Sequence, residues 1–200
     1  MARGATPASR SPACARAVSR CPVAFSHTTA AVLLPVALLV MAEALSGFDC
    51  SIRVLNSDAI LEQAGMKAVQ LGVVEKPIVN DSVDRVTLRE DRLVLAGDPH
   101  GVWMVREHGS GVRYYTDLYF KTVGFMPSRM IEVANNAAIG AALAAGFGCS
   151  LVSAAAVPAG VPTRELGDEF VRRFYALVPR SGLTPGQREL AGRVIAALRG

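Results

Sequence analysis

Lysine is rare in this sequence, and acidic residues are absent from its first 42 positions. Only three of the 21 basic residues are lysines, so the net charge of +4 comes almost entirely from arginine. Four of those arginines lie within the first 20 residues, whereas the first carboxylate is Glu43. Without that N-terminal segment the chain is close to neutral, and its charge therefore does not indicate a fold that binds nucleic acid.

Metal-binding patterns are also missing. The four cysteines, Cys14, Cys21, Cys50 and Cys149, do not have the spacing of metal ligands. Cys149 falls in a stretch that predicts a buried strand, and isolated cysteines of this kind are typical of free thiols in a reducing cytosol. The sequence therefore predicts neither a metal site nor a cofactor.

The sequence gives little support for catalysis. There is no serine in a nucleophile elbow, no pair of histidines and no Cys–His spacing. Gly109-Ser110-Gly111 lacks the lysine of a phosphate-binding loop. Glu75 and Glu107 follow predicted strands and could act as bases, but such carboxylates are more often solvated charges at the rim of a site. An enzyme is therefore the third hypothesis, behind two kinds of binding module.

What the sequence does contain is ample material for a core. The chain has 200 residues, of which 51% are hydrophobic and 19% charged. This composition excludes global disorder, and the length suits one domain or two small lobes. Residues 1–21 are an exception, because they are rich in alanine, arginine, serine and proline without any apolar period. We interpret them as a disordered basic tail.

Residues 130–153 carry the clearest secondary-structure signal. The first four predict a strand, after which Asn135 or Asn136 offers a side-chain oxygen to the free N–H groups of a helix N-terminus. Residues 137–145 are nearly all alanine, which predicts a short and mostly buried helix. A second strand at 149–152 completes a βαβ unit, the building block of parallel sheets that are covered by helices.

The rest of the chain alternates strands and helices in the same way. Further strands are predicted at residues 22–26, 49–55, 69–74, 86–88, 92–95, 102–105 and 173–178, and further helices at 30–42, 59–64, 112–123 and from Thr184 onward. The last helix opens with the capping box Thr184-Pro185-Gly186-Gln187. Two such series in one chain predict an α/β protein with two doubly wound halves.

In a doubly wound sheet, ligands bind beyond the carboxyl ends of the strands, where helix N-termini point their free N–H groups. Four predicted turns of this kind carry hydroxyls, amides or bare backbone: Ser26, His27, Thr28 and Thr29; Asn56 and Ser57; Gly109, Ser110 and Gly111; and Asn135 and Asn136. Each turn taken singly is explained as well by a helix cap, and His27 fits a loop residue and an effector contact equally. Because the four turns come from both halves and meet at one place, together they predict a site for a small anion such as a carboxylate or a sulfur oxyanion.

The apolar run at residues 30–42 has two interpretations. An arginine-bearing leader, 13 uncharged residues and Ala42-Glu43-Ala44 are typical of a secretory signal with a small-residue cleavage site. Against this, the leader is long, Pro35 lies within the run, and 13 residues are too few to span a bilayer, which takes about 20. A buried helix explains the same residues, and we favour it.

Five short segments, taken in order, resemble the effector-binding part of LysR-type transcriptional regulators. They are Leu33-Leu34-Pro35, Val54-Leu55-Asn56-Ser57-Asp58, Leu71-Gly72-Val73-Val74-Glu75, Trp103 to Arg113, and Asn135 to Gly148. The resemblance covers roughly residues 22–199. It implies two Rossmann-like lobes of periplasmic-binding-protein type II, joined by two crossover strands.

The resemblance also implies a division of the chain and a function. Residues 1–21 would be the disordered tail, residues 22–97 with 174–200 effector-binding lobe I, and residues 98–173 effector-binding lobe II. The winged helix-turn-helix of the family would precede Val23, where only 22 residues are available. We therefore expect a truncated, cytoplasmic regulator that senses a small anionic metabolite and meets DNA only through a missing or partner domain.

The expected protein partner is a second copy of the chain or a full-length regulator, and no membrane association is expected. The alternative function is that of a secreted periplasmic-type solute-binding protein, with residues 1–44 as its signal peptide.

Overall fold

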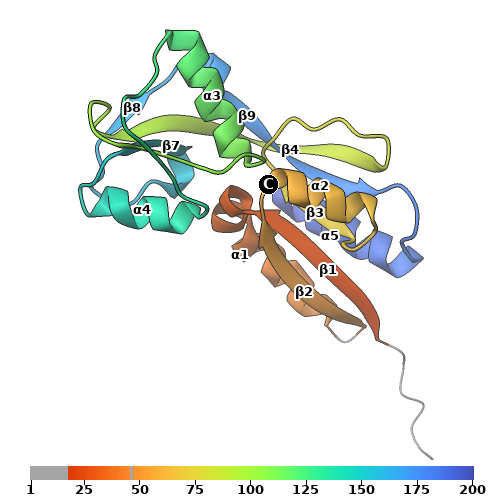
Figure 1. Ribbon diagram of the computed structural model, residues 1–200. Coiled ribbons are helices and arrows are strands. Elements are labelled where there is room, and N and C mark those ends of the chain that lie inside the picture. The colour runs from red at the N-terminus through yellow and green to blue at the C-terminus, as the bar shows by residue number, and fades with distance from the viewer. Residues whose placement is uncertain (1–17, 46) are drawn as a thin grey trace, which may run out of the picture.

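The computed structural model describes residues 18–45 and 47–200 (Figure 1). Within these residues, nine strands form one extended mixed sheet in the order β2-β1-β3-β9-β4-β7-β5-β6, with β8 paired to β4. Helices cover both faces of this sheet, and the molecule divides into two lobes that β4 and β9 connect. The predicted fold class, two Rossmann-like lobes with two crossover strands, is confirmed.

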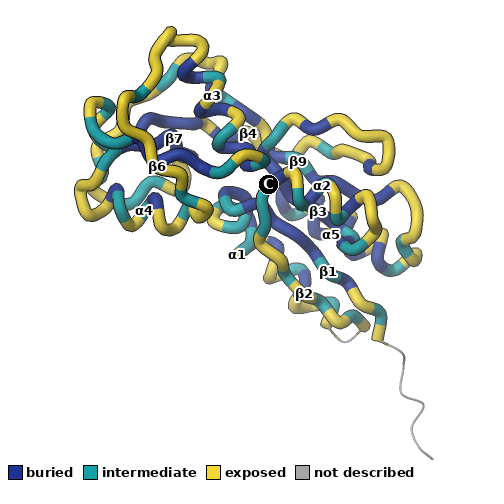
Figure 2. Tube along the Cα trace, viewed as in Figure 1, coloured by how far each residue is buried: buried dark blue, intermediate teal, exposed yellow. Residues whose placement is uncertain are grey.

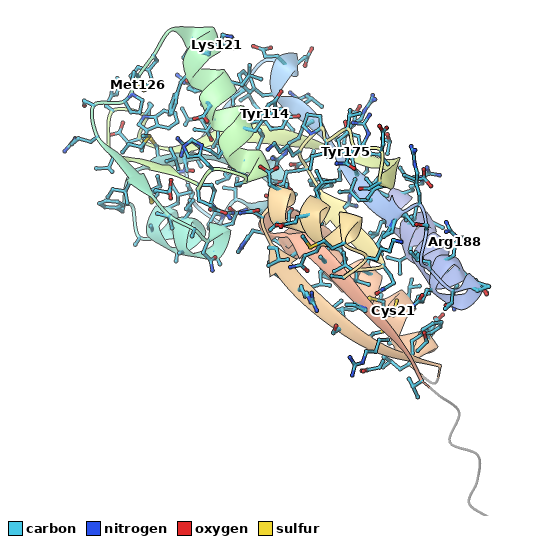
Figure 3. The ribbon with its side chains drawn as sticks, turned by 45° about the vertical axis from the view of Figure 1, so that its right-hand side comes forward. Cys21, Tyr114, Lys121, Met126, Tyr175 and Arg188 are labelled. Carbon is cyan, nitrogen blue, oxygen red and sulfur yellow. The ribbon has the colours of Figure 1, made fainter. Side chains whose placement is uncertain are left out.

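Lobe I is built on three parallel strands. It contains β1 (Ser19–Ser26), β2 (Phe48–Leu55) and β3 (Leu71–Val74), with the helices α1 (His27–Ala44), α2 (Ser57–Gly65) and α5 (Pro185–Arg199). Leu33 of α1 and Val194 of α5 pack on one face of the sheet against Phe25, and Ile60 of α2 packs on the other face. Cys21 is buried in β1 (Figure 3) and stands opposite Cys50 in the register of β1 and β2.

Lobe II repeats the arrangement on a smaller scale. It contains β5 (Trp103–Val105), β6 (Met130–Glu132), β7 (Cys149–Ser153) and β8 (Thr163–Glu165), the helices α3 (Gly111–Val123) and α4 (Asn136–Ala144), and two 3-10 turns, η1 (Ala154–Ala156) and η2 (Asp168–Phe170). Trp103 is almost fully buried, stacks on Tyr119 and meets Phe120 edge to face, both from α3. Ile139 and Leu143 of α4 cover the other face.

Two long antiparallel strands join the lobes. β4 (Val83–Gly97) and β9 (Val171–Pro179) pair with each other through lobe I and as far as Arg92 and Val171. From Leu93 onward β4 pairs with β7 instead. The sequence predicted two separate strands here, but β4 is continuous, and the register shift between Thr87 and Glu90 takes up the irregular part. A β-bulge lets a strand bend without ending, which explains the difference.

Two expected boundaries differ from the observed pairing. β1 begins at Ser19, because Ser19 to Cys21 pair with β2 and bury Cys21, so the last residues of the expected tail are part of the sheet. Residues 1–17, the rest of that tail, lie outside the described residues. Leu93–Gly97 belong to the sheet of lobe II, although they were expected in lobe I. Hydrophobic pattern alone does not reveal which neighbour a long strand pairs with.

Helices α1 and α4 are more exposed than predicted (Figure 2). Only Ile139 and Leu143 of α4 are buried, and Leu39 of α1 remains 72% exposed. α1 is long and apolar enough to cross a membrane by length and composition. Its other face nevertheless packs into lobe I through Leu33, Ala37 and Met41, as expected for a core helix.

Candidate functional site

Helix N-termini from both lobes face the junction between them. Three of these helices have side-chain caps: Ser26 accepts from the backbone N of Thr29, Asn56 from Ala59, and Asn135 from Ala137 and Ala138. Asn56 and Asn135 lie at helix starts that the sequence predicted, whereas Ser26 was expected at the end of a strand. Ser110 precedes α3 without forming a side-chain cap. The free backbone N–H groups and the dipoles of these helices favour negative charge at the junction.

A cavity of about 680 Å³ opens at this junction, between the start of α1 and the length of α4. Its polar end is formed by His27, Asn135 and Asn136. Its remaining wall is made of small apolar groups: Ala31, Val54, Ala137, Gly140, Ala141, Ala144, Ala156 and Pro158. Such a wall is adapted to a ligand that combines one polar group with an apolar body.

Arg106 is the charged group at the centre of the junction. It follows β5, and its side chain is 1% exposed. Nε and Nη2 donate to the two carboxylate oxygens of Glu107, both at 2.8 Å, and Nη1 donates to Oδ1 of Asn136. This bidentate geometry is the one in which a guanidinium binds a carboxylate or another planar anion most strongly.

The same hydrogen bonds connect the two lobes. Nδ2 of Asn136 in lobe II donates to Oγ1 of Thr28 in lobe I at 3.0 Å. Nδ2 of Asn56 in lobe I donates to Oε1 of Glu107 at 3.4 Å. These two contacts link Thr28, Asn136, Arg106, Glu107 and Asn56 into one chain of hydrogen bonds, which we call the cleft network. A ligand that changes any of these partners also changes the contact between the lobes.

The backbone of the glycine turn adds a third contact across the junction. The backbone N of Asp58, in the first turn of α2, donates to the carbonyl of Gly109 at 3.2 Å. Gly109 has a φ of +92°, which an L side chain rarely adopts. Glycine is therefore required at this position for the turn that brings α3 against α2.

Ser26 and Thr29 serve the fold of α1 rather than the cleft. Oγ1 of Thr29 donates to the carbonyl of Val73 at 2.8 Å, and Oγ of Ser26 accepts from the backbone N of Thr29 at 3.1 Å. Both side chains are at most 1% exposed. Their hydroxyls tie the start of α1 to β3 and position His27 and Thr28 at the junction.

Glu75 and Ser57 lie deeper at the same junction. Both are at most 2% exposed, and Oε2 of Glu75 and Oγ of Ser57 have no hydrogen-bond partner among the described residues. Glu75 lies directly beneath Gly111, where an added Cβ would come within 2.5 Å of the glutamate Cγ. Only glycine at position 111 therefore allows the start of α3 to approach Glu75.

The environment of the junction shifts two titratable groups. Burial lowers the pKa of His27 from its ordinary value, and the neighbouring positive charge of Arg106 lowers it further. Burial acts to raise the pKa of Glu107, but the hydrogen bonds and the charge of Arg106 outweigh it, so the pKa of Glu107 lies below its ordinary value. The site thus holds a neutral histidine beside an ionised arginine–glutamate pair near pH 7.

The structure brings the predicted residues to one place but gives them different roles. His27, Asn135 and Asn136 line the cavity, Thr28, Asn56 and Asn136 belong to the cleft network, and Gly109 contacts α2. Ser57, Ser110 and Gly111 are buried at helix starts. The described residues contain no group of three or more histidine, cysteine or acidic side chains that could hold a metal ion.

Sequence reasoning missed Arg106 and assigned Glu107 to the solvated rim. The available signal was their position, because two charged residues directly follow the apolar strand residues 102–105 and precede Gly109. Charges placed at the carboxyl end of a parallel strand lie at the ligand-binding edge of the sheet.

Among curated proteins, this chain is similar to the transcriptional regulator CysL of Bacillus subtilis (strain 168), with 21% identity over 168 residues, 76% of this chain and 56% of CysL. It is also similar to the transcriptional regulator CbbR of Rhodospirillum rubrum, with 27% identity over 139 residues, 63% of this chain and 47% of CbbR. The chain spans about half the length of these relatives.

Two solved structures have the same fold. The CcmR regulatory domain of Synechocystis PCC6803, in complex with 2-PG, has a TM-score of 0.74 and 22% identity over 91% of this chain and 98% of that chain. The effector binding domain of QuiR, in complex with shikimate, has a TM-score of 0.76 and 12% identity over 92% of this chain and 98% of that chain. A family model described as the LysR substrate binding domain matches residues 17–199, and the chain therefore belongs to that family, the effector-binding domain of LysR-type transcriptional regulators.

Proposed function

We propose that this chain is the effector-sensing domain of a transcriptional regulator and that it binds a small anionic metabolite between its lobes. The observation that carries the proposal is the buried guanidinium of Arg106, which lies among four helix N-termini and belongs to a network that spans both lobes. Buried charges require a partner, and an arginine in this setting is suited to a carboxylate or a sulfur oxyanion.

The size and wall of the cavity support a compact ligand. Its alanine and glycine surface accepts an apolar body, while His27, Asn135 and Asn136 are placed to orient a polar group. CcmR and QuiR, which share the fold, were each solved with a small molecule bound. We propose binding rather than catalysis at this junction.

The output of the domain would be a change in the relative position of the lobes, passed to DNA through a further segment or a partner. A second copy of the chain or a full-length regulator is the partner that we propose. The exposed apolar side chains of α1, among them Leu38 and Leu39, are suited to such pairing.

β1 and α1 supply much of the core of lobe I, so removal of residues up to Ala44 would destroy that lobe. We therefore favour a cytoplasmic regulator over a cleaved, secreted solute-binding protein.

The test is thermal unfolding of the purified chain against a panel of carboxylates, amino acids and sulfur oxyanions. We expect at least one compound to raise the unfolding temperature in a concentration-dependent way, because a ligand that binds only the folded state stabilises it. Binding should then be confirmed by calorimetry and should be lost in Arg106→Gln. A panel without any stabilising anion would contradict the proposal.

A further inference from the structure

Glu107 is placed on Arg106 as an external anion would be. Its two oxygens each accept one guanidinium N–H at 2.8 Å, and Oε1 also accepts from Asn56 of the opposite lobe. The carboxylate therefore takes both of the parallel donors that make Arg106 an anion-binding group. Any incoming carboxylate or sulfate would need the same two N–H groups.

The local chain conformation holds this pair together. Residues 106–110 form a turn between β5 and α3, in which the backbone N of Ser110 donates to the carbonyl of Glu107 at 3.2 Å. Nη1 of Arg113 donates to the carbonyl of Arg106 at 2.9 Å, which fixes the other side of the turn to α3. Neighbouring side chains that would diverge in a continuous strand are thereby brought face to face.

The two partners differ in exposure, and this difference makes the pair exchangeable. The side chain of Arg106 is 1% exposed, whereas that of Glu107 is 21% exposed. The guanidinium is enclosed by protein, whereas the carboxylate already contacts solvent and can turn further toward it. Arg106 thus needs an anionic partner at all times, while Glu107 does not need Arg106.

We propose that Glu107 is an internal substitute for the effector: it occupies the anion subsite of Arg106 in the unliganded domain, and the anionic group of the effector binds by displacing it. This inference rests on the proposed function. Displacement would break the contact between Asn56 and Glu107 while the contact between Thr28 and Asn136 can remain. The effector would then take over one of the two side-chain hydrogen bonds by which the cleft network crosses between the lobes.

An internal competitor sets the affinity of the site. A carboxylate tethered one residue away acts at an effective concentration on the order of millimolar or higher, so an external anion must outcompete it. Removing its charge should therefore increase the affinity for a simple anion. We expect at least a tenfold lower Kd for sulfate when Glu107 is replaced by the uncharged and nearly isosteric glutamine.

The experiment measures sulfate binding to the full chain by calorimetry and thermal unfolding, with sodium chloride added to keep the ionic strength constant. The variants are Glu107→Gln, Arg106→Gln and the charge-conserving Arg106→Lys. Glu43→Gln is the matched control, because Glu43 also pairs with an arginine, Arg193, but lies away from the cleft. Circular dichroism establishes that each variant is folded, and Arg106→Lys replaces Arg106→Gln if the latter does not fold.

The inference is supported if Glu107→Gln binds sulfate at least ten times more tightly than the wild type, Glu43→Gln matches the wild type, and the Arg106 variants lose binding. It is overturned if Glu107→Gln and the wild type bind sulfate equally and both depend on Arg106. In that case the anion site of the proposed function stands. If no variant binds sulfate or any carboxylate of the panel, the proposed function fails together with the inference.

Discussion

Two buried arginines pair with carboxylates where the lobes meet, one in the cleft and one between the crossover strands. In the cleft pair, Arg106 is buried and Glu107 is 21% exposed. In the hinge pair, Arg172 of β9 is 0% exposed and Asp91 of β4 is 3% exposed, with a distance of 2.8 Å between Nε and Oδ2. The cleft pair can therefore exchange its anion with solvent, whereas the hinge pair is closed to solvent.

The surroundings of the hinge pair explain why it is fixed. Oγ of Ser153 donates to the second oxygen of Asp91 at 2.5 Å. The guanidinium of Arg172 lies 5.6 Å from the ring centroid of Tyr115 and 6.0 Å from that of Phe174, and its Nη1 and Nη2 have no hydrogen-bond partner among the described residues. Asp91 and Arg172 face each other in the register of β4 and β9. Among the described residues, Asp91 is thus the one carboxylate that pairs with Arg172.

The largest effect is expected from Asp91→Asn. This change keeps the shape of the side chain but leaves the charge of Arg172 buried without a counter-charge. Breaking a buried pair in this way costs about 3–5 kcal/mol, and we expect a loss of that size in the free energy of unfolding measured in urea.

Sulfate sharpens the comparison between the two pairs. Added sulfate should raise the stability of Glu107→Gln toward that of the wild type, because the ion reaches Arg106. The difference in stability between Asp91→Asn and the wild type should be the same with and without sulfate. Equal rescue of both variants would show that solvent ions reach the hinge, and the distinction between the pairs would be wrong.

The next largest effect is expected from Thr28→Ala. The Thr28 hydroxyl accepts from Nδ2 of Asn136, the residue that also binds Arg106, so its loss leaves the amide without its partner across the cleft. We expect the binding of a panel anion to weaken by about 1–3 kcal/mol in calorimetry. Thr116→Ala is the matched control, since the buried hydroxyl of Thr116 donates to the carbonyl of Val112 in its own helix and lies outside the cleft network. A similar loss of binding in both variants would show that the contact between Thr28 and Asn136 has no specific role in anion binding.

The sequence alone was sufficient to predict those features that depend on residues close together in the chain, such as helix caps. The caps of Asn56 and Asn135 and the capping box of Thr184 were predicted, and each is present. These signals are local, because a short polar side chain satisfies an N–H only two or three residues away. The family resemblance added the arrangement of the lobes.

The cleft network could not be predicted in the same way. Arg106 meets Asn136, 30 residues further along the chain, and Asn136 meets Thr28, 108 residues away. Which charged residue becomes buried depends on how the lobes pack, and a sequence shows only that two charges follow a strand. The same reasoning explains β4, whose change of partner from β9 to β7 at Leu93 leaves no mark on its hydrophobic pattern.

A smaller effect is expected from pH, through His27. Burial and the charge of Arg106 lower the pKa of His27 in the folded state, while Glu107 and Glu75, which also face it, act in the opposite direction. As the pH falls below 6.5, the unfolded chain takes up a proton that folded His27 does not, so stability should decrease. Stability above that pH should be unaffected by this group.

His27→Gln tests this dependence. The variant should lose less stability than the wild type between neutral and mildly acidic pH, as measured by urea unfolding at a series of pH values. His100→Gln, which removes an exposed histidine from a turn, is the control. Identical pH profiles for the wild type and His27→Gln would contradict the burial of a neutral imidazole at the junction.

The smallest effect is expected from Glu43→Gln, which breaks an arginine–carboxylate pair at the surface. Glu43 of α1 and Arg193 of α5 are 2.6 Å apart, closer than either pair at the lobe junction, but their side chains are 70% and 45% exposed. Water solvates both charges when the pair is broken, so we expect a loss of no more than about 0.5 kcal/mol in urea unfolding. The carboxylates of the three pairs are 3%, 21% and 70% exposed for Asp91, Glu107 and Glu43, and the cost of neutralising each should fall in that order. If Glu43→Gln loses as much free energy of unfolding as Asp91→Asn, then the distance between the charges, and not their burial, determines the strength of these pairs. The exposure of Glu107 would then be no reason to expect that it exchanges with an external anion.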